Sequence, residues 1–239
     1  MNTRQLSIDE AVRLNPGDQH YRAFVGPTER YDLIGATQFS LLFLLGLREH
    51  HRLLDFGCGS LRLGRLAIPY LRPGGYFGVE PEAWLVEEGF DRELGRDARA
   101  IKRPRFDYNR EYRADVFGER FDFIVAQSIF SHTGTDASRR ALGSFASVLA
   151  DGGLVVANWL IGAETAELAP DDCDWVYPGC VPFEPARVEG LAAEAGLAVR
   201  RCPWPHPGGL TWFVMAKDAN ALPDEAQMAR MAVAPAARP

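Results

Sequence analysis

Six consecutive residues, Asp55-Phe56-Gly57-Cys58-Gly59-Ser60, place a carboxylate and two glycines where a short apolar run gives way to a helical pattern. Glycine lets backbone N–H groups approach a ligand closely, and a helix N-terminus behind the loop favours electron-rich groups. Glu80 follows the next apolar run, 21 residues after Gly59. In a parallel sheet, a carboxylate at that position accepts hydrogen bonds from the hydroxyls of a ribose. These two segments therefore predict a nucleoside site.

The type of nucleoside follows from Asp55 and Arg62. A dinucleotide cofactor normally meets the pattern Gly-x-Gly-x-x-Gly, and Arg62 occupies the position of the third glycine. Asp55 would repel a pyrophosphate but attract an ammonium group, directly or through water. S-adenosylmethionine has an ammonium group, a ribose and no phosphate, so it fits these residues better than a dinucleotide.

Strand-like and helix-like runs alternate around these residues. We expect strands within residues 53–56, 76–79, 105–108, 121–127 and 154–159, and helices over 61–71, 81–94, 135–149 and 185–195, with Gly152-Gly153 as the turn before the fifth strand. Repeated units of this length predict an α/β fold, a Rossmann-like, doubly wound and mostly parallel sheet. Two further strands, 197–201 and 211–217, are joined by a proline-rich segment too short for a crossover helix. They should form a C-terminal antiparallel pair.

The flanking segments complete three expected regions. Residues 1–50 should form an N-terminal helical cap, with helices over 8–14 and 33–47, and residues 51–217 the main domain. The apolar run 39–47 reads as a buried helix, because it is about half the length that a membrane span needs. Residues 218–239, rich in Ala and Pro, should form a loosely ordered tail.

Composition excludes several classes of function. The chain has 239 residues, of which 47% are hydrophobic and 24% charged, as in ordinary globular proteins. A net charge of −6 makes nucleic acid a poor partner, and no apolar segment suggests a membrane partner or a secretory signal. Four scattered cysteines fit a reducing cytoplasm. Cys173, Cys180 and His206 match no standard metal spacing, so we expect no metal.

Four segments, LLDFGCGSLRLGR, YFGVEPE, FDFIVAQSIFSHTG and LADGGLVVANW, resemble in order the class I S-adenosylmethionine-dependent methyltransferases over roughly residues 33–217. The antiparallel strand at the end of the sheet is also a feature of that family. The resemblance implies S-adenosylmethionine as cofactor. It places Asp55, Gly57, Gly59 and Ser60 around the methionine part, with Cys58 as a small packing residue of the same loop, and it places Glu80, next to Pro81, on the ribose.

The resemblance also implies roles for more distant positions. Asp107 or Asn109, after the third strand, would meet the adenine, and Gln127 and Ser128 would border the methionine carboxyl and the transferred methyl group. Tyr31 and Gln38 match positions that close over the site in some members of the family.

His132 follows the fourth strand and is the candidate catalytic base, because an imidazole can take a hydroxyl proton at neutral pH. The alternative is that it caps the following helix or orients the loop. Trp159 is a candidate for an aromatic substrate wall, together with Trp175, Tyr177, Trp204 and Trp212, although a Trp near a sheet end is often part of the core.

The expected function is methyl transfer to a small molecule, most simply O-methylation of a sugar or natural-product intermediate by a cytoplasmic monomer or homodimer. Ala126-Gln127-Ser128-Ile129 stands where enzymes that methylate adenine or glutamine nitrogens carry Asn-Pro-Pro-Tyr or Asp-Pro-Pro-Tyr. Three alternatives remain open at this point. They are a non-methylating enzyme of the same cofactor (aminocarboxypropyl transfer or cofactor cyclisation), an inactive cofactor-binding subunit, and, more distantly, a dinucleotide dehydrogenase.

Overall fold

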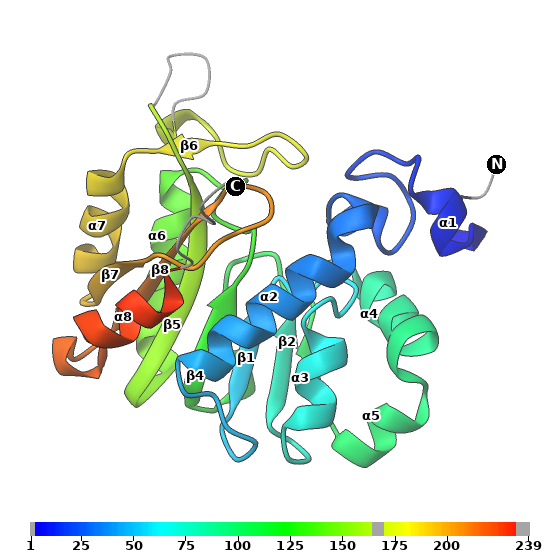
Figure 1. Cartoon of the computed structure of the whole chain (residues 1–239), viewed down its shortest axis with the longest axis horizontal. Coiled ribbons are helices and arrows are strands. Elements are labelled where there is room, and N and C mark those ends of the chain that lie inside the picture. The colour runs from blue at the N-terminus through cyan, green and yellow to red at the C-terminus, as the bar shows by residue number, and fades with distance from the viewer. Residues whose placement is uncertain (1–2, 164–169, 233–239) are drawn as a thin grey trace, which may run out of the picture.

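The sheet has the strand order β3-β2-β1-β4-β5-β8-β7, and a short strand, β6, pairs with β5 at its far end (Figure 1). The computed structural model describes residues 3–163 and 170–232. The strands are β1 (Leu53–Phe56), β2 (Tyr76–Val79), β3 (Arg105–Asp107), β4 (Phe121–Ala126), β5 (Leu149–Ile161), β6 (Pro182–Phe183), β7 (Ala198–Cys202) and β8 (Thr211–Ala216).

All pairs formed among strands β1 to β6 are parallel. Strand β8 runs antiparallel to both of its neighbours, β5 and β7. The mostly parallel sheet and the antiparallel pair at its end are therefore confirmed. The carboxyl ends of β1, β2 and β4 meet at one edge, with Phe56 beside Val79 and Asp55 beside Val125. This edge is where an open α/β sheet binds its ligand.

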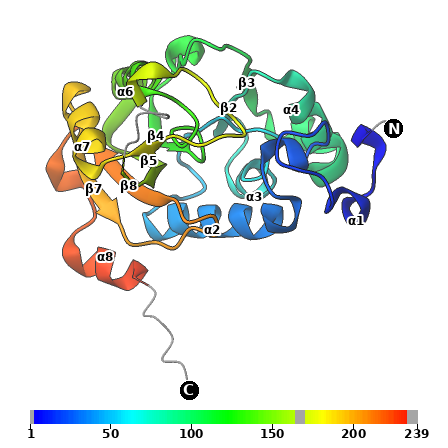
Figure 2. The ribbon, with the colours of Figure 1, turned by 90° about the horizontal axis from the view of Figure 1, so that it is seen from above.

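Helices cover both faces of the sheet, with α2 and α8 on one side and α6 and α7 on the other (Figure 2). Their bounds are α1 (Ile8–Ala11), α2 (Tyr31–Leu44), α3 (Gly64–Tyr70), α4 (Ala83–Gly89), α5 (Asp97–Lys102), α6 (Thr135–Val148), α7 (Pro185–Glu194) and α8 (Glu225–Met231). Shorter 3-10 turns are η1 (Thr3–Gln5), η2 (Ala23–Val25), η3 (Thr28–Arg30), η5 (Asp115–Phe117), η6 (Pro170–Asp172) and η7 (Ala219–Ala221), and η4 (Phe90–Leu94) is a π-helix.

Alternating strand residues supply two hydrophobic cores, one under each helix layer. Ile124 and Ala126 of β4 join the core beneath α6 and α7, whereas Phe123 and Val125 join the core beneath α2, α3 and α8. This is the period of two that a strand buried on both faces requires.

Two local expectations are wrong. Gly152 and Gly153 lie inside β5, which begins at Leu149, where they accompany a register shift between β4 and β5. Gly152 has φ +75°, so the two glycines form an irregularity within a strand instead of a turn before it. Helix α3 starts at Gly64, three residues later than expected, because the glycine loop continues through Leu61 at φ +62°.

The apolar run at 39–47 is only half buried. Leu41 and Leu42 are fully buried, whereas Phe43 and Leu44 are 44% and 51% exposed. Helix α2 lies across one face of the sheet, so a single side of it meets the core. The helix is less buried than expected, because its apolar residues are not confined to one face.

The segment from residue 218, which was expected to be a loosely ordered tail, instead forms the 3-10 turn η7 and helix α8. Asp224 caps α8 in a capping box with Gln227, and Met228 and Met231 are buried in the core beneath α2. Residues 233–239 of that expected tail lie outside the described residues.

Candidate active site

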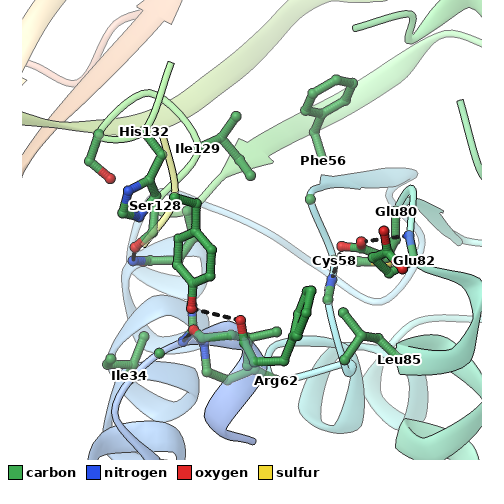
Figure 3. A pocket seen from close by; sticks show the side chains of 18 of the residues that line it. Ile34, Phe56, Cys58, Arg62, Glu80, Glu82, Leu85, Ser128, Ile129 and His132 are labelled. Atoms are coloured by element: carbon green, nitrogen blue, oxygen red, sulfur yellow. Dashed lines mark hydrogen bonds between the residues drawn. The ribbon is translucent and has the colours of Figure 1, made fainter. Parts of the chain in front are cut away.

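A cavity of about 640 Å³ opens at the carboxyl ends of β1, β2 and β4, a volume in the range of small-molecule sites. Figure 3 shows Glu80 and Glu82 at one side of it and Ser128 and His132 at the other. Residues from the N-terminal cap and from the segment that follows η6 complete the walls. Its lining residues include Phe24, Val25, Ile34, Gln38, Asp55, Gly57, Cys58, Gly59, Arg62, Glu80, Pro81, Leu85, Asn109, Gln127, Ser128, Ser131, His132, Trp175, Tyr177, Cys180, His206 and Leu210.

The glycine loop is shaped by contacts that only glycine allows. Gly57 and Gly59 have φ +76° and +53°, where a side chain is strained. A Cβ on Gly57 would lie 2.1 Å from Ile129 Cδ1, and one on Gly59 would lie 2.7 Å from Val25 Cγ1. The N–H groups of Gly57 and Cys58 donate to Val79 O, which ties the loop to β2.

Glu80 links the end of β2 to this loop. One carboxylate oxygen, Oε2, accepts from the N–H of Gly59 and the other, Oε1, from the N–H of Glu82, both at 2.9 Å. Burial raises the pKa of Glu80 to about 7, against the opposing effect of these two bonds. Each oxygen keeps a lone pair, so the group can still accept two hydroxyls.

Asp55 is buried at the floor of the cavity, where its Oδ2 accepts from the hydroxyl of Tyr76 at 2.7 Å. Burial raises the pKa of Asp55 to about 6, and Tyr76 and Arg62 oppose this rise. An ammonium group in the cavity would stabilise the ionised form.

His132 lines the opposite side of the cavity and is 8% exposed. Its Nδ1 lies 2.6 Å from Gly179 O, and since a carbonyl oxygen can only accept, Nδ1 carries the proton. Burial lowers the pKa of His132, so the ring is neutral at pH 7 and Nε2 has a free lone pair. Trp175 and Tyr177 pack edge-on against the ring.

Several predicted residues do not reach the cavity. The hydroxyl of Tyr31 donates to Ser60 O at 2.9 Å, so both residues brace the glycine loop from behind, while Gln38 does line the cavity. Asp107 accepts from the backbone and side-chain nitrogens of Asn109, and of these two residues only Asn109 lines the cavity.

Trp159 does not line a substrate wall. It is fully buried and stacks on Phe130 with ring centroids 4.4 Å apart. Val155, Ala157 and Trp159 alternate along β5 and share one core, so the period of two already placed this side chain inward. Trp175 and Tyr177 line the cavity instead.

Two cavity residues were not predicted for their position. His206 lies on the loop between β7 and β8, and its Nε2 is 2.7 Å from the side-chain amide of Gln127. Arg62 lies in the glycine loop and lines the cavity. From the sequence, it was noted only as the residue at the third glycine position of the dinucleotide motif. Among the described residues, no group of three or more His, Cys, Asp or Glu is arranged to hold a metal.

Two buried polar atoms of the cavity residues, Gln127 Oε1 and Ser131 Oγ, have no hydrogen-bond partner among the described residues. An unsatisfied buried oxygen is costly, so such atoms indicate ligand contacts. Three acceptor groups face the cavity: the carboxyl group of Asp55, the unpaired Oε1 of Gln127 and the carboxyl group of Glu80. They suit the ammonium and the ribose hydroxyl groups of S-adenosylmethionine, which are hydrogen-bond donors. The site therefore fits this cofactor.

A family model described as "Methyltransferase domain" matches residues 54–155, which include the glycine loop, Glu80 and His132. No curated protein sequence matches the chain. No helix in residues 3–163 and 170–232 is long and apolar enough to cross a membrane.

Solved structures share the fold at low identity. Magnesium protoporphyrin IX methyltransferase (ChlM) from Synechocystis with bound S-adenosylmethionine is 12% identical, with 90% of this chain and 93% of that chain covered and a TM-score of 0.58. DesVI from Streptomyces venezuelae is 19% identical, covering 82% and 95%, with a TM-score of 0.57. CalS10, an amino pentose methyltransferase from Micromonospora echinaspora, is 16% identical, covering 79% and 92%, with a TM-score of 0.55.

The sheet order, the antiparallel β8 and the glycine loop define a Rossmann-like fold of the methyltransferase type. With the family match across the glycine loop, residues 54–155 form a methyltransferase domain, the fold is that of the class I S-adenosylmethionine-dependent methyltransferases, and the protein acts as an S-adenosylmethionine-dependent methyltransferase.

Proposed function

We propose that this methyltransferase transfers a methyl group to a hydroxyl of a small molecule, such as a sugar or a natural-product intermediate, with His132 as the base. The proposal rests mainly on the hydrogen bond from His132 Nδ1 to Gly179 O, since it leaves a neutral Nε2 in the same cavity as the glycine loop. Two structural neighbours are named for small acceptors, magnesium protoporphyrin IX and an amino pentose.

The residues divide into two groups around the cavity. Asp55, Gln127 and the glycine loop would hold the methionine part of the cofactor, and Glu80 its ribose. When bound, S-adenosylmethionine supplies a methyl group that is already a strong electrophile. The protein must therefore position the acceptor, exclude water and remove one proton.

The acceptor side favours a hydroxyl over an ammonium group. The cavity residues around His132 are neutral ones, Ser131, Trp175, Tyr177 and Cys180. Asp174, an acid of the cavity wall, is ion-paired with Arg140 at 3.3 Å. An ammonium would need a free carboxylate here, whereas a hydroxyl needs a neutral base such as His132.

The test is a turnover assay with purified protein, S-adenosylmethionine and a panel of hydroxylated sugars and phenols, in which S-adenosylhomocysteine formation is measured. His132→Asn should lower kcat by about 10²–10⁴-fold, the range of general-base catalysis, and leave cofactor affinity within twofold. In the native protein, the rate should decrease at pH values below the lowered pKa of His132, because the ring becomes charged there. A rate that stays constant as the pH is lowered to the acid limit at which the protein remains folded would contradict the base role, and methylthioadenosine as product would contradict methyl transfer.

A further inference from the structure

Trp175 is a large apolar side chain that the fold holds half exposed at the acceptor side of the cavity. It is 49% exposed and lines the cavity, and its ring centroid lies 5.8 Å from that of His132. The backbone fixes this position, because Trp175 forms a β-bridge with Thr133 and Val176 N donates to His132 O at 2.9 Å. An aromatic face that is held open beside the candidate base is free to contact a ligand.

Tyr177 extends this aromatic surface. Its ring centroid lies 4.8 Å from that of His132 and 6.0 Å from that of Trp175, and the ring planes of Trp175 and Tyr177 are inclined by 32°. The hydroxyl of Tyr177 donates to Phe24 O at 2.6 Å. The proton of this hydroxyl is therefore already engaged with the cap, and the part of Tyr177 that remains for an acceptor is mainly its ring.

The polar groups beside these rings are few. Within the described part of the chain, Ser131 Oγ has no hydrogen-bond partner, and Nε2 of His132 is the position of the base. Asp174 is already paired with Arg140, and the thiol of Cys180 is a weak hydrogen-bonding group. A sugar would bring several hydroxyl groups to this wall, and each one left without a partner costs free energy. A flat apolar ring with one reacting hydroxyl fits the wall better.

The acidity of the acceptor hydroxyl also favours an aromatic ring. Burial lowers the pKa of His132, so its neutral imidazole is a weaker base than that of an exposed histidine. A phenol hydroxyl, with a pKa of about 10, gives up its proton far more readily than a sugar hydroxyl does. A weak base is therefore sufficient for a phenol, whereas a sugar needs a stronger one.

We infer that the acceptor is a phenol whose aromatic ring lies against Trp175 and Tyr177. Its hydroxyl then lies between Ser131 Oγ and His132 Nε2. This inference rests on the proposed function and narrows it to one class of acceptor. In the reaction, the phenol oxygen forms a bond to the methyl carbon, the S–C bond breaks with its electron pair left on sulfur, and the phenol proton passes to His132 Nε2.

The first experiment compares acceptor classes in steady-state assays of S-adenosylhomocysteine formation. The panel holds mono- and dihydroxyphenols, the saturated cyclohexanol counterpart of each, and methyl glycosides. The native protein should methylate at least one phenol with a kcat/KM about 100-fold above that of its saturated counterpart and of every glycoside. A glycoside or a cyclohexanol that is turned over as well as the best phenol would overturn the inference and leave the proposed function standing. If no hydroxyl acceptor gives S-adenosylhomocysteine, the proposed function fails as well.

The second experiment tests the ring contact with the best phenol. Trp175→Leu should raise the KM of this phenol by about 10-fold, the loss expected for one aromatic contact. Trp175→Phe keeps an aromatic face and should keep KM within about threefold of the native value. Both variants should bind S-adenosylhomocysteine within twofold of the native affinity in calorimetry, which shows that the cavity is folded.

Phe43→Leu is the matched control. Phe43 of α2 is also an exposed aromatic residue, at 44%, and it lies outside the cavity wall. This variant should leave the KM of the phenol within twofold. An unchanged KM in Trp175→Leu, or an equal rise in Trp175→Leu and Phe43→Leu, would overturn the inference.

Discussion

Two buried carboxyl groups, Asp55 and Glu80, dominate the electrostatics of the site. Burial raises the pKa of Asp55 to about 6 and of Glu80 to about 7, from usual values near 3.8 and 4.5. The folded protein therefore holds these protons more tightly than the unfolded chain. Their contribution to the free energy of unfolding is complete below the usual values, and it is lost as the pH rises through 6 and 7. The two ionised carboxyl groups therefore lower the free energy of unfolding at neutral pH, and a bound cation and ribose would compensate for their burial.

Cofactor affinity should consequently rise with pH. The proposed contact with the cofactor ammonium requires ionised Asp55, whose fraction increases about tenfold between pH 5 and pH 7 for a pKa of about 6. Calorimetry should show about tenfold tighter binding of S-adenosylhomocysteine at pH 7 than at pH 5, with proton release to the buffer near pH 6. Asp55→Asn should weaken binding and remove the part of the pH dependence centred at 6. An affinity that is constant from pH 5 to 7.5 in the native protein would contradict this role.

The loop after β4 and the segment after η6 are joined along their length. Val176 N donates to His132 O, Val181 N to Ser131 O and Gly134 N to Asp174 O. These bonds bring Gly179 O to His132 and hold Trp175 and Tyr177 at the cavity. A pair of segments about 45 residues apart in the chain thus forms one wall.

Gly134 is the tightest point of this wall, because a Cβ there would lie 1.8 Å from Cys173 O and 2.6 Å from Pro170 O. Gly134→Ala should push the segment away and lower kcat by about 10- to 100-fold, since misplacement by about 1 Å is enough for such losses. Cofactor affinity, measured by calorimetry, should change less than threefold.

Gly143→Ala is the control in α6, the helix that begins directly after Gly134, and an added Cβ at Gly143 meets nothing within 4 Å. It should leave kcat unchanged and raise the free energy of unfolding by about 0.5–1 kcal/mol, because Ala favours the helix. Equal kinetics for the two variants would show that the wall does not position the acceptor site.

Across the whole molecule, a buried charge network joins the N-terminal cap to the sheet domain. Arg22 contacts Glu93 at 2.5 Å and Asp32 at 3.1 Å, Tyr21 donates to Glu93 at 2.8 Å, and Arg65 lies 2.8 Å from Asp32. The side chains of Arg22 and Glu93 are only 6% and 7% exposed. We propose that residues 3–50 and the sheet domain unfold as one unit, because this network and α2 cross the boundary between them.

Arg22→Ala tests this unit by leaving Glu93 buried with less compensation. The free energy of unfolding should fall by about 3 kcal/mol, which corresponds to about 6–12 °C in Tm for a chain of this size. Arg13→Ala, on the exposed side of the cap, should change Tm by less than 2 °C. Thermal unfolding by calorimetry should show one transition for each variant. A separate early transition for Arg22→Ala, with the main one unmoved, would show that the cap unfolds alone.

The glycine loop, the position of Glu80 and the alternation of strands and helices could be predicted from the sequence, because they depend on local sterics and on periodicity. The antiparallel β8 followed from the short loop before it. The buried α8 could not be predicted, since its two apolar side chains, Met228 and Met231, gain their burial only from the core under α2.

The chemistry of the site was encoded residue by residue, but its geometry depends on contacts between distant segments. The sequence alone shows that His132 follows β4 and that Arg62 follows the glycines. The proton position on His132 depends on Gly179, 47 residues further along the chain, and the place of the Arg62 guanidinium depends on its hydrogen bond to Val25 O in the cap. The two tryptophans show the same contrast between local and distant causes. The pleat of β5 turns Trp159 into the core, whereas a backbone pairing with Thr133 holds Trp175 at the cavity. Local pattern decides residue type and order, whereas protonation, pairing and access depend on which surfaces the packed chain brings together.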